Sequence, residues 1–101
     1  MRTLLTGITG YVGSELIEPL TSAGHELRGV ARNPGRADPR VPTVKGDLDT
    51  GDGLAEALDG IDLAYYLVHS MEGTADFTGR ELRAAQRFAR AAAEAGVPRI
   101  V

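Results

Sequence analysis

The sequence predicts an α/β fold, a doubly wound parallel sheet with helices on both faces, and three observations support this. Strand and helix signals alternate along the 101 residues, and such alternation builds parallel sheets through right-handed crossovers. An apolar run at the amino terminus leads into Gly7, Gly10 and Gly13, spaced three residues apart, and then into a helix. Residues 61–68 (IDLAYYLV) form a nearly continuous apolar run, which is typical of a strand covered on both faces.

The first expected strand and helix lie on either side of these glycines. Residues 3–6 form a short apolar strand, and residues 11–23 form a helix whose apolar side chains recur at helical spacing. Gly24 ends this helix, because glycine readily takes the left-handed conformation that follows a helix. A second strand at 26–31 completes a β-α-β unit.

The middle of the chain is less regular. Residues 32–42 contain three prolines and are expected to form a loop, with at most a weak helical turn. A third short strand spans 41–45. A short helix at 52–58 follows it, with Asp49 and Thr50 as candidate N-caps.

The last part contains the strand at 61–68 and the longest helix, at 77–95. One apolar stripe is expected along that helix, made of Leu82, Ala85, Phe88, Ala89 and Ala92. Gly96 ends the helix, and residues 99–101 begin a fifth strand. Because the chain stops as this strand begins, we expect residues 1–101 to be the N-terminal portion of one domain, without the rest of that domain or the substrate-binding segment.

Composition narrows the function classes. The net charge of −3 gives no support for nucleic-acid binding, which needs a concentrated basic face. Cysteine is absent, so disulfides and thiolate metal sites are excluded, and the nearby acids Glu56, Asp59 and Asp62 do not form a metal cluster. No apolar run is long enough to span a membrane, and the amino terminus does not have the pattern of a signal peptide. We therefore expect a cytoplasmic protein without a metal site.

The glycine segment carries the most specific chemistry. Gly7 suits a tight turn, Gly10 a close approach of the backbone to a ligand, and Gly13 a close contact between helix and strand. A helix amino terminus at such a turn directs N–H groups at an anion. The spacing G-x-x-G-x-x-G differs from the familiar G-x-G-x-x-G of dinucleotide sites. We interpret the segment as the pyrophosphate-binding turn of a dinucleotide site, the alternative being a glycine-rich turn without a ligand.

The end of the second strand bears on the choice of cofactor. An acidic residue there binds the ribose hydroxyls of NAD, whereas this chain has Arg32, with Arg36 nearby. An arginine at this place can hold a 2′-phosphate through paired hydrogen bonds. The sequence therefore favours NADP, with NAD possible. The alternative is that both arginines are solvated loop residues.

Two further segments follow strands. After the third strand, Asp47 could accept a hydrogen bond from an adenine amino group while Leu48 packs on the ring, or Asp47 could simply cap its own loop. Val68 and His69 lie at the carboxyl end of the fourth strand, at the point where open α/β sheets bind ligands. We expect their backbone to line the cofactor. His69 could instead orient a substrate or donate a proton.

These segments resemble one family. Residues 6–13 (TGITGYVG) resemble the TGATGYVG of atypical and extended short-chain dehydrogenases/reductases, and residues 46–48 match the family's GDL. Residues 64–71 (AYYLVHSM) are similar to an atypical subgroup described as NAD(P)-binding or NmrA-like. The resemblance covers essentially the whole chain and implies a Rossmann domain that binds NAD(P). The family's catalytic Tyr-x-x-x-Lys pair, when present, falls after strand five, so no catalytic residue is assigned here.

The resulting hypothesis is the NADP-favouring cofactor-binding domain of an atypical oxidoreductase with an unknown small-molecule substrate. The alternatives are a non-catalytic NADP-sensing regulatory protein, which the absence of a downstream Tyr-x-x-x-Lys pair would favour, and a small domain without a cofactor. The residues expected to contact the cofactor are Gly7, Thr9, Gly10, Tyr11, Val12, Gly13, Arg32, Asp47, Leu48, Val68 and His69.

Overall fold

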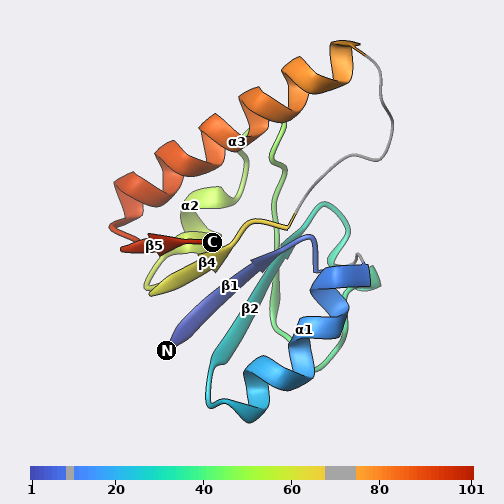
Figure 1. The fold of residues 1–101 in the computed structure, drawn as a ribbon, viewed down its shortest axis with the longest axis vertical. Helices are drawn as coiled ribbons and strands as arrows, with labels where there is room; N and C mark the ends of the chain where they lie inside the picture. Colours follow the sequence, from blue (N-terminus) through green and yellow to red (C-terminus); the bar gives the residue numbers. More distant parts are fainter. Residues whose placement is uncertain (9–10, 68–74) are drawn as a thin grey trace.

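The computed structural model describes residues 1–8, 11–67 and 75–101, and it is drawn in Figure 1. Strands and helices alternate as expected. In chain order they are β1 (Arg2–Thr6), α1 (Tyr11–Ser22), β2 (Glu26–Ala31), the 3₁₀ turn η1 (Pro34–Arg36), β3 (Thr43–Lys45), α2 (Leu54–Leu58), β4 (Leu63–Tyr65), α3 (Ala75–Ala95) and β5 (Arg99–Ile100).

All five strands belong to one parallel sheet with the order β3-β2-β1-β4-β5. Leu5 in the central strand β1 pairs with Gly29 of β2 on one side and with Tyr65 of β4 on the other. The chain therefore builds outward from β1 to β3, then crosses to the other side of β1 to form β4. Open α/β sheets bind ligands at such a reversal, at the carboxyl ends of the strands.

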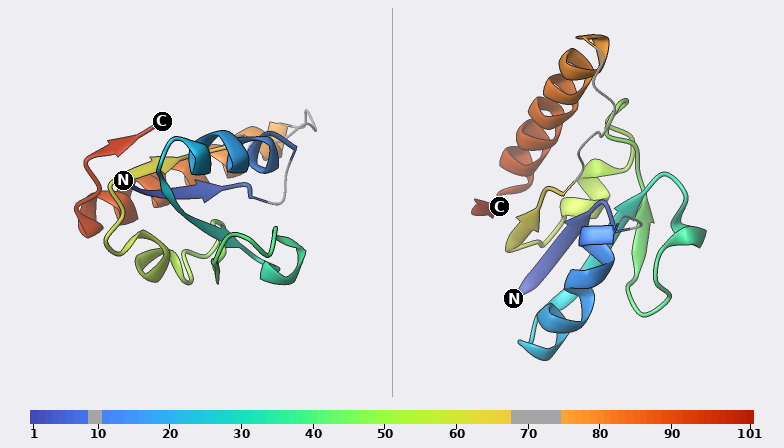
Figure 2. Two further views of the ribbon diagram at one scale, coloured as in Figure 1. Left: turned by 90° about the horizontal axis from the view of Figure 1, so that it is seen from below. Right: turned by 45° about the vertical axis from the view of Figure 1, so that its right-hand side comes forward.

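Helices cover both faces of the sheet, which confirms the predicted doubly wound arrangement. Leu5 packs with Ile8 and Ile17 on the α1 face. Leu4 packs with Leu58 of α2 and Phe88 of α3 on the opposite face. Figure 2 shows α1 and α2 on opposite sides of the sheet. Residues 3–6 of β1 are completely buried, as a central strand between two helical layers should be.

The predicted strand at 61–68 is too long. Regular pairing covers only β4, which lies between β1 and β5, and Val68 lies outside the described residues. The reason is a side chain. The amide of Leu67 donates to Thr6 Oγ1 at 2.9 Å instead of to a β1 carbonyl, so the ladder ends there.

The predicted N-caps of the short helix are wrong. Helix α2 begins at Leu54, and its N-cap is Gly53, which makes no side-chain capping hydrogen bond. Gly53 has φ of +76°, and a Cβ on it would collide with the Lys45 carbonyl oxygen, so only glycine fits. Thr50 accepts the Asp52 amide at 3.2 Å, so its hydroxyl shapes the loop before the helix.

The predicted apolar stripe of the last helix is also partly wrong. Among the α3 side chains that the structure describes (residues 79 and 81–95), the buried ones are Ala84, Phe88 and Ala92, whereas Leu82 is 58% exposed and Ala89 is exposed. At 100° per residue, Ala84 and Ala92 lie within about 40° of Phe88 around the helix, whereas Leu82 and Ala89 lie about 100° or more away. Phe88 therefore sets the buried face of the helix.

The β5 end of the sheet exposes apolar side chains. Ile100 is 42% exposed and Val101 is 60% exposed, and the Tyr66 amide donates to the Val101 carbonyl at 2.9 Å.

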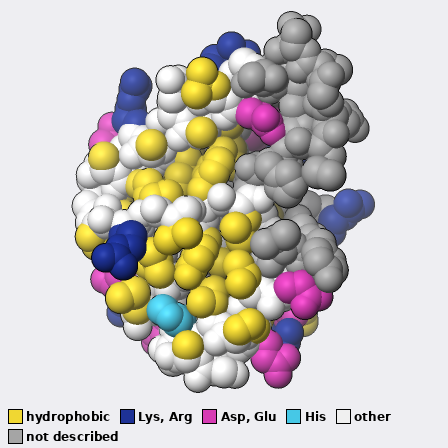
Figure 3. All heavy atoms as spheres, in the orientation of Figure 1, with side chains coloured by type: hydrophobic (Ala, Val, Ile, Leu, Met, Phe, Trp, Pro, Cys, Tyr) yellow, Lys and Arg dark blue, Asp and Glu magenta, His cyan; other side chains and the backbone are white. Residues whose placement is uncertain are grey.

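On the face drawn in Figure 3, hydrophobic side chains gather across the middle, and charged side chains lie mainly toward the rim. No helix within the described ranges is long and apolar enough to cross a membrane.

Candidate functional site

The turn after β1 brings two strand ends together. Gly7 has φ of +67°, a conformation that residues with a Cβ rarely adopt. A Cβ on Gly7 would lie 3.3 Å from the backbone carbonyl of Leu67, just past β4. The turn is therefore packed against the carboxyl end of β4. The strand order reverses at β1, and β4 is the neighbour of β1 on the side away from β2.

Gly13 lets helix α1 approach this turn. A Cβ on Gly13 would collide with the Gly7 carbonyl oxygen, far inside van der Waals contact. The first turn of α1 thus rests directly on the backbone of Gly7, as the glycine spacing predicted. Tyr11 and Val12 begin the helix, and Thr9 and Gly10 lie outside the described residues.

Thr6 fixes the end of β1 to the end of β4. Its buried hydroxyl donates to the Tyr65 carbonyl at 2.9 Å and accepts the Leu67 amide at 2.9 Å. Both hydrogen-bonding functions of the hydroxyl are therefore used to hold the two strand ends in register. Val68 and His69, which follow Leu67 in sequence, lie outside the described residues.

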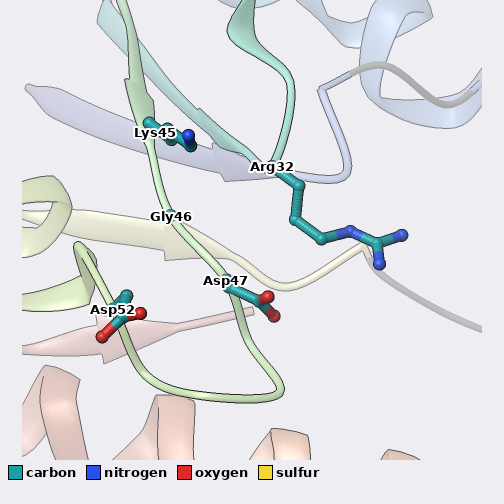
Figure 4. A pocket seen from close by; sticks show the side chains of 5 residues that line it. All are labelled: Arg32, Lys45, Gly46, Asp47 and Asp52. Carbon is teal, nitrogen blue, oxygen red and sulfur yellow. The ribbon is translucent and has the colours of Figure 1, made fainter.

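A hollow of about 290 Å³ lies at the carboxyl ends of β2 and β3, and Figure 4 shows it from close by. It is lined by Arg32, Lys45, Gly46, Asp47 and Asp52. Figure 4 shows the exposed Arg32 side chain extending past the end of β2, with the Asp47 carboxylate pointing to the same side. Within the described residues, Arg32 forms no ion pair. Its guanidinium is therefore available to an anion in this hollow.

The loop that forms one wall of this hollow, residues 46–53, is closed by its own hydrogen bonds. The Asp47 amide donates to the Asp52 carbonyl at 2.9 Å, and the Gly51 amide donates to the Asp47 carbonyl at 2.7 Å. The Asp49 amide donates to Asp47 Oδ1 at 2.8 Å. Asp47 therefore caps its own loop. This role is compatible with the other role predicted for Asp47, which is to accept a hydrogen bond from an adenine amino group.

Leu48 faces the protein interior in part. It is half-buried and packs against the cluster that contains Leu4, Leu58 and Phe88. Its backbone carbonyl accepts a 2.7 Å hydrogen bond from Arg87 Nη1. The position of the loop is thus coupled to helix α3.

Two cations of this region were not predicted from the sequence. Arg87 contacts the loop across 39 residues of sequence, and no local pattern could have revealed that contact. Lys45 lines the hollow beside Arg32. Its position directly before Gly46-Asp47 was the available signal.

Among the described side chains, Tyr66 and Asp38 have shifted pKa values. Burial raises the pKa of Tyr66, and the negative charges of Glu81 and Asp49 raise it further. Hydrogen bonds from Arg40 lower the pKa of Asp38 to about 2. The Asp38 carboxylate therefore forms an ion pair within its own loop, with Oδ2 lying 2.8 Å from Arg40 Nη2. In the part of the chain that the structure describes, no three acids or histidines cluster as metal ligands.

Comparison with known proteins agrees with this geometry. A family model described as NAD(P)H-binding matches residues 7–101. A 3-beta-hydroxysteroid dehydrogenase of Mycolicibacterium neoaurum is 40% identical over 67 residues, which are 64% of this chain and 18% of that protein. A 3 beta-hydroxysteroid dehydrogenase/Delta 5→4-isomerase of Mycobacterium tuberculosis is 36% identical over 73 residues, 70% of this chain and 20% of that protein.

Solved structures share the fold. A short-chain dehydrogenase/reductase superfamily protein from Agrobacterium tumefaciens, with bound NAD, superposes with a TM-score of 0.81 at 26% identity. The match covers 99% of this chain and 31% of that one. The chain thus spans less than a third of these relatives, and its resemblance to the short-chain dehydrogenases/reductases is confirmed over that span.

Proposed function

Since the chain belongs to the NAD(P)H-binding family, with the Rossmann fold of the short-chain dehydrogenases/reductases, we propose that it is the cofactor-binding part of an oxidoreductase that prefers NADP. Residues 1–101 form the cofactor-binding portion in this proposal, and the substrate is a small molecule held by other parts of the enzyme. The bound cofactor would supply hydride transfer.

The residues present fit such a cofactor. The Gly7 and Gly13 backbones lie where any Cβ would meet neighbouring backbone, so only glycines let the amino end of α1 pack this closely on the end of β1. A helix amino terminus in this place suits a pyrophosphate, because backbone N–H groups and the helix dipole both favour an anion. Thr9, Gly10, Tyr11 and Val12 complete this turn in the proposal. Val68 and His69 would border the cofactor at the end of β4.

Preference for NADP rests on one observation, the Arg32 side chain in the hollow at the ends of β2 and β3. The 2′-phosphate distinguishes NADP from NAD, and a guanidinium can bind it through two charge-assisted hydrogen bonds. Lys45 adds a second positive charge to the same hollow. Asp47 and Leu48, on the loop at the other side of the hollow, would contact the adenine.

Charge reversal at Arg32 tests this preference. In Arg32→Glu, NADPH affinity should fall at least about tenfold, because a charge-assisted hydrogen bond contributes about 1.5–3 kcal/mol. NADH affinity should stay the same or rise, because a carboxylate can accept from the ribose hydroxyls. Fluorescence titration gives the dissociation constants for NADPH and NADH, and their ratio measures the preference for NADP.

Arg90→Glu is the matched control, since Arg90 is an exposed arginine on α3. It makes the same charge change away from the hollow and should leave the ratio of the two constants unchanged. An unchanged ratio in Arg32→Glu would show that Arg32 does not select the cofactor. The regulatory alternative, a non-catalytic NADP sensor, uses the same site and differs in lacking a Tyr-x-x-x-Lys pair.

A further inference from the structure

We infer that Arg87 is a positioning residue for the adenosine half of the cofactor site, although it belongs to helix α3 and lies outside the hollow. This inference rests on the proposed function, because it takes the loop at 46–53 to contact the adenosine. Arg87 is half-buried, and it reaches this loop across 39 residues of sequence.

The head group of Arg87 holds one side of the loop. Its Nη1 donates to the Leu48 carbonyl oxygen at 2.7 Å. A distance this short is typical of a hydrogen bond assisted by a full charge. Leu48 directly follows Asp47, one of the two acids that line the hollow, so this bond fixes the backbone next to the proposed adenine contact.

The stem of Arg87 holds the other side of the same loop. A Cβ on Gly51 would lie 3.1 Å from Arg87 Cδ and 3.6 Å from Cγ, so the methylene groups pack directly against Gly51. Gly51 has φ of +89°, and its amide bonds back to the Asp47 carbonyl at 2.7 Å. One side chain therefore braces the loop at two points, Leu48 and Gly51.

The two ends of the loop have other anchors. At its start, the Gly46 amide donates to the Ala31 carbonyl of β2 at 3.0 Å. Beyond its end, the far end of helix α2 is held by Arg28, whose Nη1 donates to the carbonyls of Ala57 at 2.9 Å and Asp59 at 2.7 Å. The bonds inside the loop fix its shape, and Arg87 fixes the place of its middle relative to α3.

Two substitutions separate the head group from the stem. Arg87→Met removes the donors and keeps an unbranched apolar stem beside Gly51, whereas Arg87→Lys keeps a cation that can donate to Leu48. Arg87→Met should weaken binding of NADPH and of adenosine 2′,5′-bisphosphate by about the same factor, roughly tenfold, since a hydrogen bond to a charged group is lost. Arg87→Lys should recover most of this affinity. Nicotinamide mononucleotide, which lacks the adenosine, should bind all variants equally.

Arg90→Met is the control, because Arg90 is an exposed arginine one turn further along α3. The affinities of Arg90→Met for NADPH and adenosine 2′,5′-bisphosphate should stay within about twofold of the wild-type values, because exposed charges on a helix surface contribute little to stability. Arg87 does not position the adenosine site if Arg87→Met leaves the affinity for adenosine 2′,5′-bisphosphate unchanged. The same conclusion follows if Arg87→Met lowers the affinity for nicotinamide mononucleotide as much as the affinity for adenosine 2′,5′-bisphosphate.

Amide hydrogen exchange of the cofactor-free protein gives a second readout. The amides of Asp49 and Gly51, both bonded to Asp47, should exchange at least about tenfold faster in Arg87→Met, because the loop opens locally more often. Unchanged exchange would overturn the inference. Failure of the wild type to bind NADPH would refute the proposed function instead, whereas normal wild-type binding with faster exchange and unaltered affinity in Arg87→Met would refute the positioning role alone.

Discussion

Replacing Gly13 with alanine is expected to weaken NADPH binding at least about tenfold. The new Cβ would collide with the Gly7 carbonyl oxygen and lie 2.9 Å from the Gly7 carbonyl carbon. Neither atom belongs to a flexible side chain, so the first turn of α1 must move away from β1. Introducing a methyl into such a contact costs about 1–3 kcal/mol. Fluorescence titration with NADPH measures the loss of affinity, and thermal unfolding measures the loss of stability.

Gly24→Ala is a control on the same helix. Gly24 follows the other end of α1 and has φ of +92°. A Cβ on Gly24 would have no atom within 4 Å, so its substitution causes strain without a collision. It should lower stability by about 1 kcal/mol and leave the NADPH dissociation constant unchanged. Equal losses of affinity in both variants would mean that the turn at Gly7 and Gly13 has no special part in binding.

Phe88→Ala should have the largest effect on stability, about 3–5 kcal/mol lost from the free energy of unfolding. The Phe88 side chain is 1% exposed, and its ring lies 5.1 Å from the Tyr66 ring between centroids. It packs in the cluster that joins β1, α2 and α3, which also includes Leu4 and Leu58. Small domains have a total stability of about 5–15 kcal/mol, so much of the margin would be lost. Urea denaturation followed by circular dichroism measures the change.

Leu82→Ala on the same helix is the comparison. Leu82 is 58% exposed, so its truncation should cost less than about 0.5 kcal/mol. A loss at Leu82 as large as the loss at Phe88 would contradict the packing of α3 described above and would support the stripe expected from the sequence.

The order of elements could be predicted from the sequence because each signal was local. The glycines at 7 and 13, the apolar run of β1 and the Gly24 helix end each depend on nearby residues. Positions 26–31 were predicted as a strand with the bounds that β2 has. The errors arose where distant contacts decide. Thr6 ends β4 from the neighbouring strand, and the Lys45 carbonyl requires glycine at position 53.

The candidate site shows the same division. The turn at Gly7 and Gly13 and the loop at Asp47 were predictable, since their residues are contiguous or follow strands. The contact of Arg87 with Leu48 depends on how α3 packs across the sheet, and sequence spacing carries no information about it. NADP preference, the individual cofactor contacts and a cytoplasmic location stay predictions.

Titration of the protein with NADPH and NADH, followed by dinucleotide fluorescence, tests directly whether this domain binds a dinucleotide. Saturable binding of one dinucleotide per chain is expected, with NADPH bound more tightly than NADH. Absence of a saturable change with either cofactor, in protein shown to be folded by circular dichroism, would contradict this expectation.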